Sequence, residues 1–479
     1  MIAVGRVQHF GICIIGAGPA GSALATRLVQ LGHSVCVIER AQFPRPRIGE
    51  LLSPGVWPQL DLLGLRTAVA AGGFRPCPTS LVQWETDIPV RRHFGTAGLL
   101  VDRGRFDALL LDHARANGAR VMQPAVLRSR ARHEEGWHLN VELSDRVHTL
   151  NVDFLADASG RSAVLRGRKE RTGPRTLALY GYWRGVSPPQ EPRIQAASDA
   201  WYWGVPLPDG TYNAMVFLDT TDFRAQRASC LSATYKELIG RSALKAAVRD
   251  ARLVGPVHAA DATPYLDGEK IGPRSIKIGE SALALDPLSS SGVQKAINTA
   301  LTGAVVVNTL LRCPERAHAA TQFYTNNITE TSDQHRRWAA AHYGIAAATR
   351  PERFWQVRSG EAAGRKRIAP SIDFDPVLPG DLVVTLSPEA MFLQEPCIVG
   401  DLVVVKPALR HPSLDRPVAY LGGQEVAPLL NGLRGAVSVS VLMNSWHIPT
   451  ELKPAIARWL LQNRVLIPSS KERQREYPQ

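Results

Sequence analysis

Three glycines near the N-terminus have the spacing that suits a bound phosphate. Gly16, Gly18 and Gly21 follow the apolar run 12–15 and precede a helical pattern over 22–31. Gly16 suits a tight turn, Gly18 lets the backbone approach a pyrophosphate, and Gly21 lets the helix pack closely on the strand. Amide groups at the start of the helix then face the phosphates. This pattern predicts a dinucleotide site formed by Gly16, Ala17, Gly18, Pro19, Ala20 and Gly21.

An acidic residue completes this site. Glu39 ends a second apolar run, 35–38, where a carboxylate can bind ribose hydroxyls. A chance glycine turn does not require a strand, a helix and an acid in this order. We therefore expect a Rossmann-like α/β domain at the start of the chain.

Three later segments have the pattern of returns to that domain. Arg103 precedes an amphipathic helix over 108–116 and a strand near 121–127, and Asp157 ends an apolar strand before a turn of small residues. The third segment runs from 275 through Glu280 and Asp286 to a long helix that opens at Gly292 and Val293. An acid there can bind ribityl hydroxyls, and helix amides can stabilise negative charge on a flavin ring. Taken singly, each segment is more typical of an ordinary turn or helix cap.

Composition limits the classes of partner. The 479 residues, 45% of them hydrophobic, suit two to four domains, and the net charge of +13 is spread along the chain. The arginines between 350 and 367 are interrupted by acids and small residues, which is typical of a solvated linker rather than a nucleic-acid surface. The six cysteines have no paired spacing, and the apolar run 304–311 is too short to span a bilayer. We expect a cytoplasmic protein without a metal, a membrane span or a nucleic-acid partner.

Together these segments resemble a known family, the FAD-dependent monooxygenases and flavin-dependent halogenases of the glutathione-reductase-like fold. The resemblance covers roughly residues 8–345 and includes the Gly-Glu pair at 49–50. It departs at Glu280, where the family usually has aspartate. It implies FAD as the cofactor and molecular oxygen as a co-substrate. Since the sequence has no second glycine turn of this type, electrons would come from transiently bound NAD(P)H or a partner flavin reductase. Besides the glycine turn, the residues expected to bind FAD are Glu39, Arg40, Arg47, Gly49, Glu50, Arg103, Val126, Asp157, Gly279, Glu280, Asp286, Gly292 and Val293.

An aromatic segment in the middle of the chain indicates a substrate site. The run Trp201-Tyr202-Trp203-Gly204-Val205-Pro206 resembles the Trp-x-Trp-x-Ile-Pro signature of the halogenases. Without the resemblance, an aromatic core strand is the simpler interpretation. With it, we expect Trp201, Trp203 and Pro206 to line the space between flavin and substrate.

Two chemical groups that the resemblance associates with halogenation are missing. The sequence has no lysine before Lys169, and the segment 79–84, which should supply one, has none. Ser289 stands where the tryptophan halogenases have a glutamate. What remains is a flavin enzyme that hydroxylates an electron-rich ring while the protein orients the substrate and excludes water.

The pattern divides the chain into domains. We expect an FAD-binding domain over 1–79, 99–176 and 265–345, and an inserted mixed-sheet substrate domain over 80–98 and 177–264. A linker over 346–370 would lead to a C-terminal module, 371–479. Strands at 379–384, 399–404 and 464–468 and helices at 425–433 and 453–462 make that module winged-helix-like, with either a binding role or a capping role.

The sequences at 201–210 and 286–292 also look like the flavoproteins that mature tryptophylquinone enzymes. One of these, which acts on quinohemoprotein amine dehydrogenase, hydroxylates a tryptophan of its protein partner. The resemblance therefore favours hydroxylation of a tryptophan side chain in a protein substrate. One alternative is a small-molecule aromatic hydroxylase or halogenase of a biosynthetic pathway, and another is a flavin-binding chaperone without turnover. The sequence does not single out catalytic residues.

Overall fold

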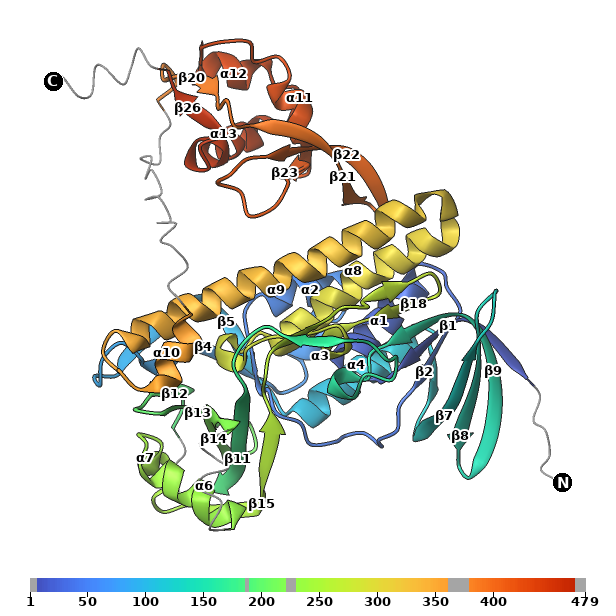
Figure 1. The fold of residues 1–479 in the computed structure, drawn as a ribbon, viewed down its shortest axis with the longest axis vertical. Coiled ribbons are helices and arrows are strands. Elements are labelled where there is room, and N and C mark those ends of the chain that lie inside the picture. The colour runs from blue at the N-terminus through green and yellow to red at the C-terminus, as the bar shows by residue number, and fades with distance from the viewer. Residues whose placement is uncertain (1–6, 186–188, 221–229, 361–378, 470–479) are drawn as a thin grey trace. The chain divides into compact units, whose positions relative to one another are not determined.

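The computed structural model describes residues 7–185, 189–220, 230–360 and 379–469 (Figure 1). The chain divides into two compact units, Met1–Arg312 with Tyr324–Ala362 and Cys313–Phe323 with Ala363–Gln479. Parts of the predicted linker and of both ends of the C-terminal module, 361–378 and 470–479, lie outside the described residues.

A mostly parallel sheet forms the centre of the first unit. Its path is β17-β18-β9-β1-β2-β6, while β8 pairs antiparallel with β9 and β7 pairs antiparallel with β8. β2 is wholly apolar and buried, and so are the last four residues of β1, 12–15, as burial on both faces requires. The predicted α/β fold with a Rossmann-like domain is confirmed. The strands are β1 (Gln8–Ile15), β2 (Val35–Ile38), β6 (Arg120–Met122), β7 (Ala125–Arg132), β8 (Trp137–Leu143), β9 (Arg146–Asp157), β17 (Ile271–Gly272) and β18 (Ser275–Lys277).

Helix α1 packs between two other helices of this domain, α4 and α8. Helix α4 starts five residues earlier than the sequence pattern indicates, because the Asp102 side chain caps it by accepting a hydrogen bond from Arg105 N at 2.9 Å. Helix α1 starts at Pro19, since proline fits the first helical turn. The bounds are α1 (Pro19–Gln30), α4 (Arg103–Ala116) and α8 (Gly292–Arg312).

A second sheet, in the order β15-β11-β14-β13-β12-β4-β5-β3, joins the segment 75–100 to the segment 176–261. Side chains along its strands point alternately to the two faces of the sheet, and both faces are apolar. Helices α6 (Leu231–Gly240) and α7 (Lys245–Val248) cover one of them (Figure 1). The strands are β3 (Leu51–Leu52), β4 (Arg75–Gln83), β5 (Val90–Leu100), β11 (Thr176–Arg184), β12 (Arg193–Ala196), β13 (Ala200–Pro206), β14 (Thr211–Asp219) and β15 (Arg252–Asp261).

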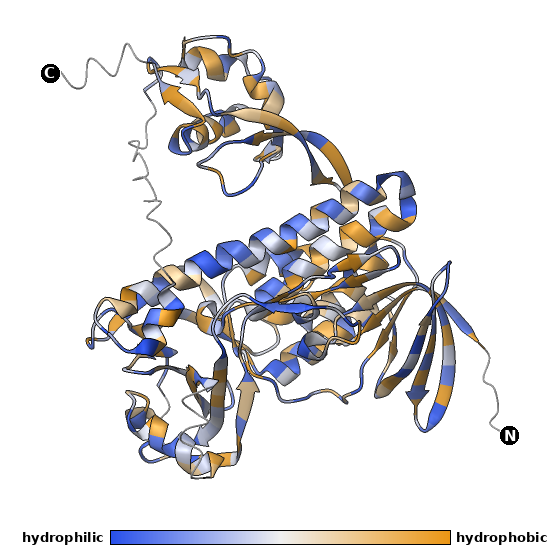
Figure 2. Cartoon of the chain, in the orientation of Figure 1, coloured by the Kyte–Doolittle hydropathy of each residue, from blue (hydrophilic) through white to orange (hydrophobic). Residues whose placement is uncertain are grey.

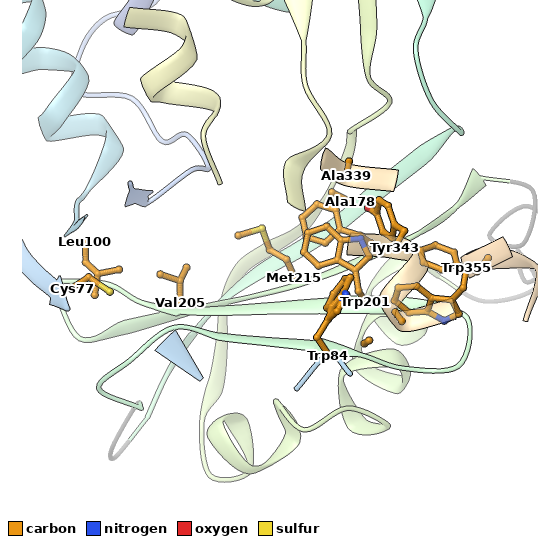
Figure 3. Close-up of a cluster of buried hydrophobic side chains, with 14 residues drawn as sticks. Cys77, Trp84, Leu100, Ala178, Trp201, Val205, Met215, Ala339, Tyr343 and Trp355 are labelled. Carbon is orange, nitrogen blue, oxygen red and sulfur yellow. The ribbon is translucent and has the colours of Figure 1, made fainter. Parts of the chain in front are cut away.

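The other face of this sheet carries an aromatic cluster, in which α9 (Ala317–Ala347) and α10 (Arg353–Ser359) take part. Trp84 lies at its centre, 6.3 Å from Trp201, 6.1 Å from Tyr343 and 5.4 Å from Trp355 between ring centroids (Figure 3). Such pairs add stability beyond the area they bury. The cluster therefore fixes the end of α9 and all of α10 against the sheet.

The described part of the predicted linker is anchored to the second sheet, although several of its residues are exposed. Trp355 Nε1 donates to Ala197 O at 2.8 Å, Arg350 Nη1 donates to Trp84 O at 2.9 Å, and Arg358 Nη2 donates to Thr176 Oγ1 at 3.1 Å. Arg350 and Arg358 are buried. Their charge indicated a solvent-exposed segment, but the neighbouring aromatic side chains anchor it and backbone carbonyls accept its guanidinium donors.

The second unit has its own apolar core. In the described residues of this unit, a three-stranded sheet, a long hairpin and short helices surround this core. The helix predicted at 453–462 is confirmed as α13, whereas α11 is shorter than expected. The winged-helix interpretation of this unit stays a prediction. The elements are β20 (Val383–Leu386), β25 (Val437–Ser438), β26 (Leu466–Pro468), the hairpin β21 (Met391–Val399) and β22 (Leu402–Arg410), α11 (Val426–Leu430), α12 (Val439–Ser445) and α13 (Lys453–Gln462).

Hydropathy follows this packing. Hydrophobic and hydrophilic residues both occur along the long helix α9 (Figure 2). Within the described ranges, no helix is long and apolar enough to cross a membrane. The same residues contain no group of three or more His, Cys, Asp or Glu side chains that could hold a metal ion.

Candidate active site

The glycine turn between β1 and α1 leaves no room for a side chain at Gly16 or Gly21. Gly16 has φ +99°, and a Cβ built there would lie 2.6 Å from Ala158 O. A Cβ on Gly21 would lie 1.8 Å from Gly16 O. Gly18 is the N-cap of α1 and makes no side-chain cap. The turn therefore presents backbone amides at the positively polarised end of a helix, as a phosphate site requires.

Glu39 lies beside this turn. It is buried, and its carboxylate accepts hydrogen bonds from Ala17 N at 2.8 Å and Ala41 N at 2.9 Å. The parallel pairing of β1 with β2 places the ends of both strands at the same edge of the sheet. The acid and the glycine turn are thus brought together as the sequence predicted.

Two arginines and an aspartate form a buried charged cluster next to Gly18. Arg103 donates to both oxygens of Asp107, at 3.1 and 3.3 Å, and to Ile48 O at 2.6 Å. Arg45 Nη1 is 3.5 Å from Asp107 Oδ2, and Arg45 Nη2 would lie 3.7 Å from a Cβ on Gly18. Burial lowers the pKa of Arg45.

Arg45 is a residue that sequence reasoning missed. Within the described residues its Nε and Nη1 atoms are buried without a hydrogen-bond partner. A buried guanidinium beside a phosphate-binding turn suits a pyrophosphate, whose oxygens can accept hydrogen bonds from these nitrogen atoms. The resemblance points instead to Arg47, two residues further along, and Arg47 is exposed in the structure.

Of the later segments that the sequence assigns to this domain, some contact the glycine turn and others do not. A Cβ on Gly279 would lie 2.8 Å from the Ala20 Cβ of α1, so this segment packs directly on the first motif. Asp157 is buried, and both of its oxygens accept from its own loop, from Ser159 N at 3.0 Å and Leu165 N at 2.7 Å. Asp157 therefore shapes a turn in this structure. Val293 is buried at the start of α8, while the remaining predicted cofactor residues Arg40, Arg47, Val126, Glu280 and Gly292 are exposed.

Glu50 faces the second sheet. Its carboxylate accepts from Gly49 N at 2.8 Å, Tyr182 Oη at 3.0 Å and Asn213 Nδ2 at 2.8 Å. Burial raises the pKa of Glu50, and burial together with the charge of Glu50 raises the pKa of Tyr182. Glu50 thus joins the Gly-Glu segment to the sheet, and its expected role in binding FAD stays a prediction.

Strand register places three rows of side chains on the sheet face that includes Tyr182 and Asn213. Because side chains alternate along a strand, these rows share one face. Trp201 stacks on Phe217 at 3.8 Å and belongs to the aromatic core, whereas Trp203 is only partly buried. Pro206 pairs with Tyr212 and lies on the opposite face, apart from both tryptophans. The rows are Tyr182–Asn213–Val205, Tyr180–Met215–Trp203 and Ala178–Phe217–Trp201.

A cavity of about 180 Å³ lies beside Asp286. Asp286 is buried, its oxygens accept from Leu288 N and Tyr343 Oη, and burial raises its pKa. His335 Nε2 is 3.1 Å from Asp286 O, and burial lowers the pKa of this imidazole. The cavity thus reaches the segment that precedes α8. Its lining includes Pro174, Pro264, Asp286, His335, Tyr343 and Arg358.

Comparison with known proteins identifies the class. The profile of the family described as tryptophan halogenase matches residues 78–374, and that of an NAD(P)-binding Rossmann-like domain matches residues 14–56. The chain belongs to the tryptophan halogenase family. This confirms the predicted resemblance to flavin-dependent halogenases and the expected class of flavin-dependent oxidoreductases.

Individual relatives match parts or all of the chain. Tryptophan 2-halogenase from Chondromyces crocatus is 32% identical over 336 residues, which are 65% of this chain and 64% of that protein. Flavin-dependent halogenase armH4 from Armillaria mellea is 29% identical over 67% of this chain and 69% of its own length. The chain therefore spans about two thirds of the length of these relatives.

Two solved structures match nearly the whole chain. The flavin-dependent halogenase CmlS has a TM-score of 0.79 at 22% identity and covers 96% of both chains, a likeness of fold. The peptidyl tryptophan dihydroxylase QhpG, described as essential for tryptophylquinone cofactor biogenesis, has a TM-score of 0.68 at 29% identity and covers 95% of this chain and 99% of its own.

The residues present fit a flavin dinucleotide. The first turn of α1, which has no side-chain cap, suits the diphosphate, as do Arg45 Nε and Nη1, which make no hydrogen bond within the described residues, and Glu39 lies beside the turn, where it accepts from Ala17 N. The sheet face with Tyr180 and Trp203 offers an aromatic surface for a substrate ring. This arrangement can bind a flavin and an aromatic ring in one domain pair.

Proposed function

We propose that this protein is an FAD-dependent monooxygenase that hydroxylates an aromatic ring, and that the ring is a tryptophan side chain of a protein substrate. One observation carries the proposal: the row Tyr180–Met215–Trp203 presents partly buried aromatic side chains on the sheet face that Glu50 joins to the Rossmann-like domain. The likeness to QhpG, which extends over nearly all of both chains, supports the polypeptide substrate.

The roles of the chain's own residues follow from their contacts. The glycine turn, Glu39 and Arg45 would hold the dinucleotide. Bound FAD would supply the redox chemistry that activates molecular oxygen. Trp203 and its row would orient the substrate ring and exclude water. Glu50 would position Tyr182 and Asn213, because it accepts a hydrogen bond from each.

The proposal also includes an electron source and a protein partner. Transiently bound NAD(P)H or a partner flavin reductase would reduce the flavin in the cytoplasm. The domain boundaries given above would make residues 371–479 an accessory module that helps to hold the polypeptide. The separate apolar core of the second unit supports a module with its own fold.

Halogenation is the second candidate, because the curated relatives are named halogenases and one reaches 32% identity. Strands β4 and β5 carry no lysine, and the sequence has none before Lys169. Ser289, in the expected glutamate position, lies 2.6 Å from Ser291 between hydroxyl oxygens. We therefore favour hydroxylation.

One assay separates these reactions. The protein is supplied with FAD, NADH, a flavin reductase, oxygen and bromide, and is offered free tryptophan, indole and a set of tryptophan-containing peptides. We expect peptide tryptophan to gain one or two oxygen atoms and no bromine, as read by tandem mass spectrometry. A Gly18→Trp variant, expected to lose FAD, serves as the control. Brominated product would establish a halogenase, and oxygen incorporation confined to free tryptophan or indole would establish a small-molecule hydroxylase.

A further inference from the structure

Lys295 is a buried cation without a carboxylate partner. It lies in the first turn of α8, is 6% exposed, and its Nζ donates to Leu283 O in β19 (Leu283–Ala284). Among the described residues no carboxylate oxygen lies within 4.0 Å of this ammonium. Lys277 in the same unit shows the usual arrangement, since it is equally buried but pairs with Asp267 at 2.8 Å.

The segment that packs over Lys295 also contacts the glycine-turn helix. Gly279 N donates to Thr299 Oγ1 at 2.9 Å, one turn beyond Lys295 on α8, and Gly279 packs against Ala20 of α1. Leu283, which accepts from Lys295, belongs to the same segment. The ammonium therefore lies against the segment 279–283, which also packs on the first turn of α1.

An unpaired ammonium is costly in such a place. Burial disfavours the charged form and lowers the pKa of Lys295 to about 8; the charge of Glu280 opposes this shift and that of Arg161 adds to it. A leucine or methionine would fill the same space without that cost. The charge is explained if an anion comes close to it during the reaction.

We propose that Lys295 stabilises the negative charge of reduced flavin. The inference rests on the proposal that FAD binds at this site. Two electrons and one proton, delivered by a nicotinamide or a flavin reductase, turn the neutral oxidised ring into an anion at neutral pH. A fixed positive charge in a low-dielectric region favours that anion. The amides at the start of α8 act in the same direction. Lys295 thus tunes the reduction potential of the flavin through its charge.

The midpoint potential of the FAD-loaded protein tests this role. In Lys295→Met, which keeps the side-chain length and loses the charge, we expect the ratio of reduced to oxidised flavin at a fixed potential to fall at least tenfold. For a two-electron couple that is a shift of about 30 mV to more negative potential. The wild-type potential should also change its pH dependence in the region where Lys295 loses its proton, and the variant should not.

Two further variants keep the proposal falsifiable. Lys245→Met, at an exposed lysine of α7, should leave the potential unchanged. Lys295→Gln should reproduce the shift of Lys295→Met, and it replaces that variant if the methionine variant folds poorly. An unchanged potential and pH profile in a Lys295 variant that retains full FAD would overturn the proposal. The measurement needs no substrate, so its outcome is independent of whether the product is hydroxylated, whereas a wild-type protein that binds no FAD would refute the proposed function itself.

Discussion

The Tyr343 hydroxyl donates to both carboxylate oxygens of Asp286, at 3.0 and 3.2 Å. The two residues are buried and 57 positions apart, so this contact ties α9 to the turn that precedes α8. Burial raises the pKa of the Tyr343 hydroxyl, and the charge of Asp286 adds to this. The hydroxyl therefore acts as a donor that fixes the acid rather than as a titrating group.

Replacing Tyr343 with phenylalanine tests this bond. The variant leaves a buried carboxylate short of a donor, a change that typically costs about 1–3 kcal/mol. We expect the Tm to fall by a few degrees and hydroxylation to slow, because the segment before α8 loses a constraint. Thermal denaturation and product formation measure the two effects. Tyr420→Phe is the control, since its hydroxyl donates to Glu425, which is only partly buried, and similar losses in both variants would contradict the special role of the buried pair.

The glycine turn gives a test that separates folding from ligand approach. A Cβ on Gly18 would have no neighbour nearer than 3.7 Å, so Gly18→Ala should fold normally. It should still obstruct the approach of a pyrophosphate to the backbone. We expect the dissociation constant of FAD to rise at least about tenfold, as measured by fluorescence titration of the apoprotein, with an unchanged circular dichroism spectrum. Gly95→Ala, where a Cβ meets open space, should bind FAD as the wild type does. Equal FAD affinity in Gly18→Ala would show that the diphosphate binds elsewhere.

Arg45 should contribute to the same affinity through its charge. Arg45→Met removes the buried guanidinium whose Nε and Nη1 have no hydrogen-bond partner in the described structure. A charge-assisted hydrogen bond is worth about 1.5–3 kcal/mol, so FAD affinity should fall about 10- to 100-fold. The effect should shrink for riboflavin, which lacks phosphate. Arg66→Met, at an exposed ion pair with Asp61, is the matched control. A loss of the same size for riboflavin would mean that Arg45 acts on folding and not on the diphosphate.

Local sequence was enough to predict the glycine turn and Glu39, because the strand, the turn and the helix follow one another directly and their geometry depends on neighbouring residues. The same holds for α13, whose apolar spacing lies within ten residues. The hydrogen-bond partners of Glu50 could not be predicted from the sequence, since Tyr182 and Asn213 come together only through the register of β11 with β14. The burial of Arg358 could not be predicted locally: its charge indicated solvent exposure, whereas its position beside Phe354 and the carbonyl of Arg175 decides its burial.

Lys295 also predicts how stability depends on pH. Its pKa is lowered from 10.5 to about 8 in the folded protein, so between these values the unfolded chain binds more protons than the folded one. The contribution of Lys295 to stability therefore becomes more favourable as pH rises through this range. Below about pH 8 the full cost of about 3 kcal/mol applies. We expect Lys295→Met, with oxidised FAD bound, to have a higher Tm than the wild type near pH 7, and the difference to shrink steadily toward pH 10. Scanning fluorimetry at a series of pH values measures it, and Lys245→Met should follow the wild type throughout. A difference in Tm that does not vary with pH would mean that the ammonium is not confined in the folded protein as its burial indicates.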